Sequence, residues 1–195
     1  MTTATTTDAP AHFSRWQIRL HWLTLLAIAL AYGAIEAKGF IPKGMAAHDI
    51  VKRLHFDFGV LVWVLMLVRL GLRLHRPDPA IVPALPRWQA VAARLAHGLL
   101  YVTFLALPVL GVLALAYGGK QWSLLGFAVP DFVTPDRATG RTLKEIHEAW
   151  AEAGYFFIGL HAAAALLHHY VRRDSALLGM MPSHWATRGR RGWIS

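Results

Sequence analysis

Four long apolar segments dominate this chain of 195 residues. Each is close to the roughly 20 residues that an α-helix needs to cross the hydrocarbon core of a bilayer. Inside lipid a helix satisfies all of its own backbone hydrogen bonds, which an isolated strand or an irregular segment cannot do. The pattern therefore predicts an all-α, four-transmembrane-helix bundle. The segments cover approximately residues 17–37, 54–74, 91–117 and 146–171.

The composition supports a membrane protein built as one domain. Only 16% of the residues are charged, the mean hydropathy is +0.38, and cysteine is absent. Soluble domains usually contain about 25% charged residues. The lack of cysteine excludes disulfides, iron–sulfur clusters and thiolate ligands. We expect a disordered tail over residues 1–13, a membrane domain over 14–182 and a basic cytoplasmic tail over 183–195.

The distribution of Lys and Arg predicts the orientation. Twelve of these residues flank the side that holds both termini, and eight flank the other side. Cytoplasmic flanks carry the excess of positive charge, so both termini are predicted to be cytoplasmic. The net charge of +9 then reflects this bias and attraction to anionic lipid headgroups. Because there is no soluble basic domain, a nucleic-acid partner is not expected.

Two histidines in the fourth segment lie on one helical face. His147 and His161 are fourteen residues apart, which is close to four full turns and about 21 Å along the axis. With both termini inside, His147 is near the periplasmic end and His161 is deeper. His55 is expected at the level of His147, and His21 at the level of His161.

Facing imidazoles in a helical bundle suit a six-coordinate haem iron. Bis-imidazole ligation closes both axial positions and favours electron transfer over oxygen binding. The pairs His21/His161 and His55/His147 would hold two haem b groups, one in each leaflet. An interfacial histidine is more commonly a polar contact than a ligand, so spacing alone leaves both interpretations open. Zinc fits less well, because no set of three or four ligands gathers at one level.

The remaining histidines are competing candidates. His97 is expected at a depth similar to that of His21, as a rival ligand or a polar neighbour of the inner haem. His48 is expected in a loop. His168 and His169 are expected near the cytoplasmic surface, where they could deliver protons to a quinone or simply line the interface. The last three are expected in tails or loops: His12, His75 and His184.

Several charged residues could support the cofactors. Arg53 is a candidate partner for a propionate of the outer haem, and Arg15 and Arg19 for the inner haem. Glu36 and Glu148 could orient an imidazole or pass a proton, or could simply cap the helices at the interface.

The chain resembles a known family. The runs QIRLHWL, AIEAKGFIPK, LHFDFGVLVWVLMLVRLGLRL, LALPVLG and IHEAWAEAGYFFIGLHAAAALLHHY are similar to those of the bacterial cytochrome b561 family. The resemblance covers residues 14–182, and the fourth-segment run is its most specific part. It implies a multi-pass inner-membrane protein with two b-type haems. It also carries the ligand roles to the matching positions His21, His55, His147 and His161.

The resemblance also implies a function. It is close to a member that passes electrons from superoxide to ubiquinone, so we expect an oxidoreductase that oxidises superoxide at the periplasmic face. Four cations near the first outer loop could capture this anion, or could contact propionates or lipid: Lys38, Lys43, Lys52 and Arg53. No motif marks the quinone pocket. The alternatives are a membrane-anchor cytochrome b subunit for a partner dehydrogenase or hydrogenase, and a non-redox membrane protein.

Overall fold

The structure, a computed structural model, describes residues 13–76 and 78–181. Its main elements are four long helices, α1 (Arg15–Phe40), α2 (Ala46–His75), α3 (Arg87–Tyr117) and α4 (Arg137–Leu167). All four are long and apolar enough to cross a membrane, with the α4 span extending into the next element. The predicted all-α class with four membrane helices is therefore confirmed. The short elements are β1 (Ser123–Leu124), β2 (Phe127–Ala128), the π-helix η1 (His168–Arg172) and α5 (Ala176–Gly179).

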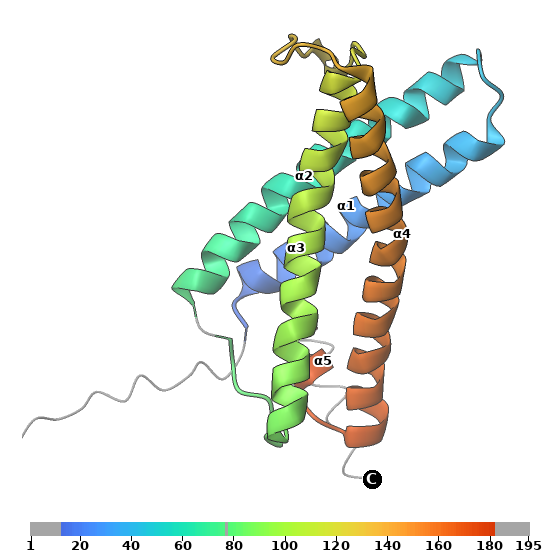
Figure 1. Ribbon diagram of the computed structural model, residues 1–195. Helices are drawn as coiled ribbons and strands as arrows, with labels where there is room; N and C mark the ends of the chain where they lie inside the picture. Colours follow the sequence, from blue (N-terminus) through green and yellow to red (C-terminus); the bar gives the residue numbers. More distant parts are fainter. Residues whose placement is uncertain (1–12, 77, 182–195) are drawn as a thin grey trace, which may run out of the picture.

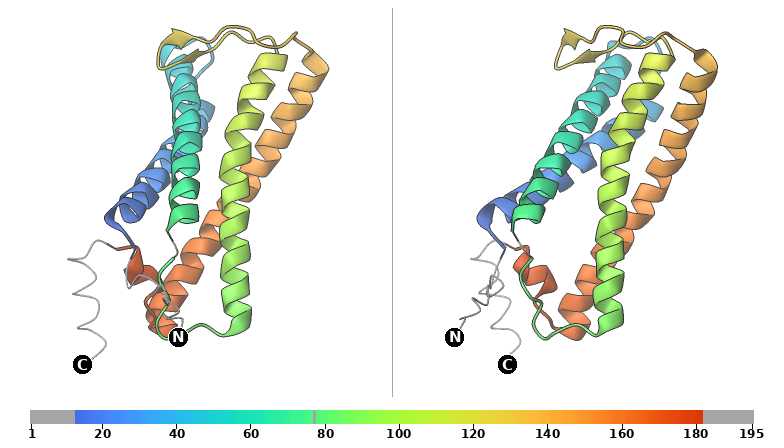
Figure 2. Two further views of the ribbon diagram at one scale, coloured as in Figure 1. Left: turned by 90° about the vertical axis from the view of Figure 1, so that its left-hand side faces the viewer. Right: turned by 60° about the vertical axis from the view of Figure 1, so that its left-hand side comes forward.

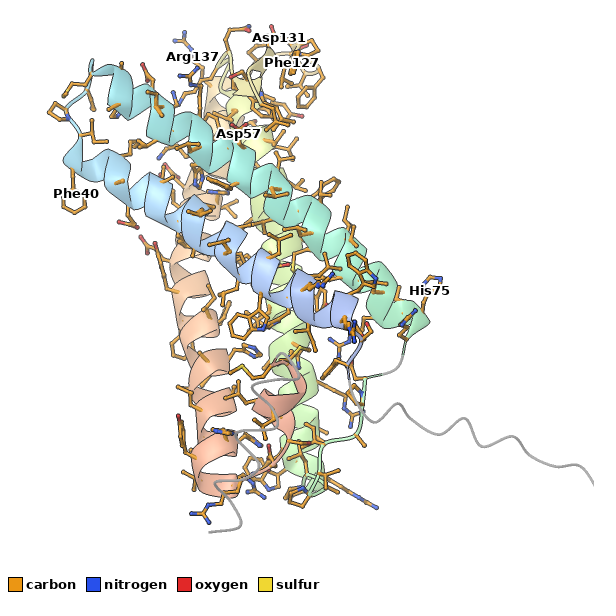
Figure 3. All side chains as sticks on the ribbon, turned by 180° about the vertical axis from the view of Figure 1, so that it is seen from behind. Phe40, Asp57, His75, Phe127, Asp131 and Arg137 are labelled. Atoms are coloured by element: carbon orange, nitrogen blue, oxygen red, sulfur yellow. The ribbon has the colours of Figure 1, made fainter. Side chains whose placement is uncertain are left out.

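The helices form two antiparallel pairs. α1 packs on α2, α3 packs on α4, and α2 joins the pairs by contacting α3. The first pair crosses the second obliquely (Figure 1). The α1–α2 connection and the β1–β2 hairpin lie at one end of the bundle, which we call the loop end. The start of α1 and the end of α4 lie at the other, the terminal end (Figure 2). Figure 3 labels Phe40 and Phe127 at the loop end, and His75 at the opposite end of α2.

α4 begins at Arg137, well before residue 146, where the apolar segment was expected to begin. The reason is a helix cap outside the apolar run. The Asp136 carboxylate accepts hydrogen bonds from the backbone N–H groups of Ala138 and Thr139, and from the Thr139 hydroxyl. These hydrogen bonds, that from the hydroxyl foremost, hold the pKa of Asp136 below its ordinary value. A hydropathy pattern detects only the lipid-facing part of such a helix.

α2 also exceeds its predicted limits. It begins at Ala46 and ends at His75. The expectation that His48 lies in a loop was therefore wrong, and so was the same expectation for His75. Both sit in polar turns that extend the helix beyond its apolar section. The two other histidines assigned to tails, His12 and His184, lie outside the described residues.

The buried core is small, and it comes from three helices. Apolar side chains are abundant on the outer surface as well, as expected where lipid rather than water surrounds a bundle. Along the described lengths of α1 and α4, no Cα atom of one lies within 8 Å of the other, so only side chains bridge them. The core residues are Ala27 and Ile28 of α1, Val62, Leu65 and Met66 of α2, and Phe104 and Leu107 of α3.

Candidate functional site

Two pairs of imidazole rings face each other at two levels of the bundle. The ring centroids of His55 and His147 are 6.2 Å apart, and those of His21 and His161 are 6.4 Å apart. Two imidazoles bound to opposite sides of one metal ion, with bonds of about 2 Å, have centroids about 6 Å apart. Both separations therefore match axial ligation of a metal ion.

At the loop end, both imidazoles are oriented by backbone carbonyls. His55 Nδ1 lies 2.9 Å from the carbonyl oxygen of Ala31, and His147 Nδ1 lies 2.9 Å from that of Leu107. A carbonyl oxygen can only accept, so each Nδ1 carries the proton and each Nε2 keeps its lone pair for a metal. A Cβ at Gly111 would lie 3.1 Å from His147 Cε1, so this glycine leaves room for the ring.

At the terminal end, each of the four long helices contributes one side chain to the cluster. His21 of α1 accepts a hydrogen bond at Nδ1 from Arg69 Nη2 of α2, at 3.2 Å. His97 of α3 lies with its ring centroid 5.2 Å from that of His161 on α4. The 5.2 Å separation is shorter than axial ligation requires, whereas the 6.4 Å between His21 and His161 matches it. The sequence analysis did not name Arg69 as a site residue. Its spacing of fourteen residues from His55, the same as that between His147 and His161, was a signal that could have identified it.

The donor set at each level fits a haem. Among residues 13–76 and 78–181, no three His, Cys, Asp or Glu side chains gather closely enough to hold a metal ion. Two facing imidazoles supply only the axial donors, so the equatorial donors must come from the cofactor, as the four porphyrin nitrogens do in haem.

Between the two levels, aromatic side chains bridge the helices. The Tyr32 hydroxyl of α1 donates to the Ala151 carbonyl of α4 at 2.9 Å, and the Tyr32 ring packs edge-on against Tyr155 at 4.4 Å. The Trp150 indole donates to the hydroxyl of Thr103, which is fully buried in α3. These contacts fix α4 relative to both neighbours at a depth between the imidazole pairs.

The two glutamates considered for orienting imidazoles have other partners. Glu36 accepts a hydrogen bond from the Tyr155 hydroxyl at 2.8 Å. Glu148 forms an ion pair with Lys144, one turn earlier on α4, at 2.6 Å. In the structure, neither carboxylate is hydrogen-bonded to a ring nitrogen of His55 or His147, whose Nδ1 atoms face carbonyls instead.

The four predicted capture cations surround the α1–α2 connection. Lys43 and Arg53 are exposed, whereas Lys38 and Lys52 are half-buried. The Lys52 ammonium lies 6.0 Å from the centre of the Phe56 ring. At this end of α2 a shallow cavity of about 200 Å³ is lined by Ile50, Arg53, Leu54, Asp57 and Gly126. Asp57 accepts a hydrogen bond from the Leu125 N–H, which ties the hairpin to α2.

A buried carboxylate lies at the terminal end. Asp174 is 1% exposed, and one of its oxygens lies 2.5 Å from Nδ1 of His168 in the π-helix. The other oxygen accepts from the Ala176 N–H at 3.0 Å. His169 packs its ring against Tyr170. The sequence interpretation named both histidines but missed Asp174, an acidic residue directly after the cations that end the apolar run.

Comparison with known proteins shows which proteins this chain is similar to. The sequence pattern of the family described as prokaryotic cytochrome b561 matches residues 12–183. A protein of Escherichia coli K12 named cytochrome b561 homolog 1 is 51% identical over 170 residues, which cover 87% of this chain and 97% of that protein.

Two further relatives have more specific names. A Yersinia pestis protein named probable superoxide oxidase CybB is 39% identical over 170 residues, covering 87% of this chain and 96% of that protein. Cytochrome b562 of Cereibacter sphaeroides is 31% identical over 175 residues, covering 87% of this chain and 94% of that protein.

Proposed function

The chain belongs to the prokaryotic cytochrome b561 family, and from this premise we propose that it is a dihaem superoxide:ubiquinone oxidoreductase. As a member of that family it is a multi-pass electron-transfer protein of the bacterial inner membrane and binds b-type haem. The proposal adds the number of haems, the donor at the periplasmic face and the acceptor. Among these relatives, the name of the Yersinia pestis protein points to the donor.

The observation that carries the proposal is the pair of facing imidazoles at each of two levels, 6.2 Å and 6.4 Å between centroids. We assign His55 and His147 to the outer haem, and His21 and His161 to the inner haem. These residues would hold haem, and bound haem would supply one-electron redox chemistry. The Ala31 and Leu107 carbonyls hold the outer rings in the tautomer that ligation by Nε2 needs.

We assign superoxide capture to the cations at the loop end. Superoxide is a monoanion, and a local excess of positive charge raises the encounter rate of small anions. Lys43 and Arg53 are the best candidates for contact with the anion, because both are exposed. Arg53 also lines the cavity beside α2. Lys38 and Lys52, which are half-buried, extend the same positive region.

We assign His168 and Asp174, at the terminal end, the role of delivering protons to ubiquinone. Two superoxide ions each lose one electron and become two molecules of oxygen, while ubiquinone takes two electrons and two protons and becomes ubiquinol. The Asp174 carboxylate accepts a hydrogen bond from His168 Nδ1–H, which orients the ring so that Nε2 can pass a proton. His168 follows His161 by seven residues, about two turns of helix, so it lies about 10 Å beyond the inner level, toward the terminal end.

The test is a stopped-flow experiment on the purified full-length protein. The reduced-minus-oxidised spectrum counts haem per chain, and a pulse of superoxide is then followed at the Soret band, without and with added ubiquinone. We expect two b-type haems, reduction by superoxide and reoxidation by ubiquinone. A protein with two haems that superoxide does not reduce would refute the proposed donor. Copurification of a stoichiometric dehydrogenase or hydrogenase would then support the membrane-anchor role.

A further inference from the structure

We propose that Arg69 is the binding residue for a propionate carboxylate of the inner haem. The proposal rests on the dihaem assignment above and adds a ligand contact to it. It replaces the sequence-based expectation for Arg15 and Arg19, which are exposed, with Arg19 stacked 5.6 Å over the ring of Trp16.

The first argument is position. Arg69 follows His55 by fourteen residues on α2, the same spacing that separates His147 from His161 on α4. Fourteen residues return a helix to nearly the same face about 21 Å further along. At the loop end α2 therefore presents an imidazole to α4, and at the terminal end the same face presents a guanidinium. Its contact with His21 confirms the level.

The second argument is charge balance. Arg69 is partly buried, and no carboxylate in the described parts of the chain forms an ion pair with it. Its neighbour Arg73, one turn along α2, pairs with Asp78 at 3.2 Å. Both guanidinium groups also lie over the ring of Tyr101, at 6.0 Å and 5.5 Å. A guanidinium withdrawn from water requires an anion, and a haem brings two carboxylates of matching planar geometry.

The third argument is the hydrogen bond to His21. Arg69 can only donate, so His21 Nδ1 is the acceptor in this contact. If His21 held a haem iron through Nε2, its Nδ1 would carry the proton and would no longer accept from Arg69. The Arg69 guanidinium, which lies 3.2 Å from His21 Nδ1, would then need a different acceptor. An adjacent propionate carboxylate would replace His21 Nδ1 as the hydrogen-bond acceptor for Arg69.

The test compares native haem with its dimethyl ester, in which both propionates are uncharged. Full-length His55→Ala protein, which lacks an outer ligand, is produced with limiting haem and loaded with either cofactor. Arg69→Leu and Arg69→Lys are then introduced, with Arg19→Leu as the matched control, and transfer of the cofactor to apomyoglobin is timed. The inner-haem midpoint potential is measured in each variant as a second readout.

We expect Arg69→Leu to speed the loss of native haem by roughly ten- to a hundredfold, the equivalent of one charge-assisted hydrogen bond. Loss of the dimethyl ester should be unchanged, and Arg69→Lys should be intermediate with native haem. The inner-haem potential should fall in Arg69→Leu, because a propionate charge is left without compensation. Arg19→Leu should match its parent in every readout.

Equal loss of both cofactors from Arg69→Leu would overturn the assignment, because it would mark a purely structural role. A large effect in Arg19→Leu would move the contact to α1. If Arg69→Leu does not fold, the parent protein decides alone, since equal retention of native haem and ester there also overturns the assignment. Full-length protein with the native histidines that carries only one haem would instead refute the dihaem proposal, and this assignment with it.

Discussion

The Tyr32 hydroxyl of α1 donates a 2.9 Å hydrogen bond to the Ala151 carbonyl of α4. It joins two helices whose Cα atoms stay more than 8 Å apart. Both ends of this hydrogen bond lie near the outer imidazole pair. Ala31, which precedes Tyr32, orients His55 through its carbonyl, and Ala151 lies one turn beyond His147. The contact therefore joins α4 to the helix whose carbonyl orients His55.

Gly154 makes this contact possible, and its replacement gives the first prediction. A Cβ at position 154 would lie 2.5 Å from the Tyr32 hydroxyl oxygen, so Gly154→Ala must displace the phenol and break its hydrogen bond. We expect a loss of about 1 kcal/mol of unfolding free energy, the typical net value of one hydrogen bond. In a Tyr32→Phe background the clash disappears, so Gly154→Ala should cost nothing further. Thermal unfolding of the four proteins measures this, and additive losses would contradict it.

The second prediction concerns the haem ligands. His161→Ala or His21→Ala should lower the haem content from two per chain to one by removing the inner haem, and His55→Ala or His147→Ala should remove the outer one. The reason is the pairing by level. Pyridine haemochrome assay of purified variants gives the count. His97→Ala should retain two haems. Loss of one haem in this variant would show that His97 of α3 is a ligand of the inner haem. His48→Ala serves as the control: this side chain lies in the first turn of α2.

The third prediction separates proton delivery from electron entry. Asp174→Asn and His168→Gln should slow haem reoxidation by ubiquinone by about a hundredfold, the usual scale of one general acid. Reduction of the haems by superoxide should keep the parent rate. His75→Gln is the matched control, because this exposed histidine also lies at the terminal end of the bundle and its ring contacts the Gly71 carbonyl of its own helix. Equal slowing of both half-reactions would indicate a structural role for the pair.

The fourth prediction concerns the capture of superoxide. Attraction of a small anion to exposed cations is screened beyond about 8 Å at physiological salt. Haem reduction by superoxide should therefore slow as ionic strength rises, and Lys43→Glu combined with Lys52→Glu should slow it further at low salt. The haem content should remain two per chain. A rate that responds to neither change would place superoxide entry elsewhere on the protein.

The fifth prediction concerns orientation. The excess of Lys and Arg at the terminal end predicts that this end is cytoplasmic. Alkaline phosphatase fused after residue 195 should be inactive, and the same enzyme inserted into the β1–β2 hairpin at Gly126 should be active in the periplasm. The opposite pattern would invert the membrane levels that we assign to both haems.

The class of fold and the candidate ligands could be predicted from the amino-acid sequence. Four apolar runs of sufficient length leave a spanning helix as the only way to satisfy the backbone in lipid. The fourteen-residue spacing of His147 and His161 fixes their common face, because helical phase is a local property of the chain. Helix limits were less accurate: α4 begins at Arg137 because Asp136 caps it in a polar region that hydropathy does not detect.

Which side chains of different helices come into contact depends on how the helices pack. The packing of α2 against α1 places Arg69 beside His21, which lies 48 residues earlier in the chain. Such contacts depend on crossing angles and on where the chain turns back, which no local periodicity encodes. Tyr32 and Gly154 illustrate the same point, since the requirement for glycine in α4 comes from a hydroxyl on a helix more than a hundred residues away.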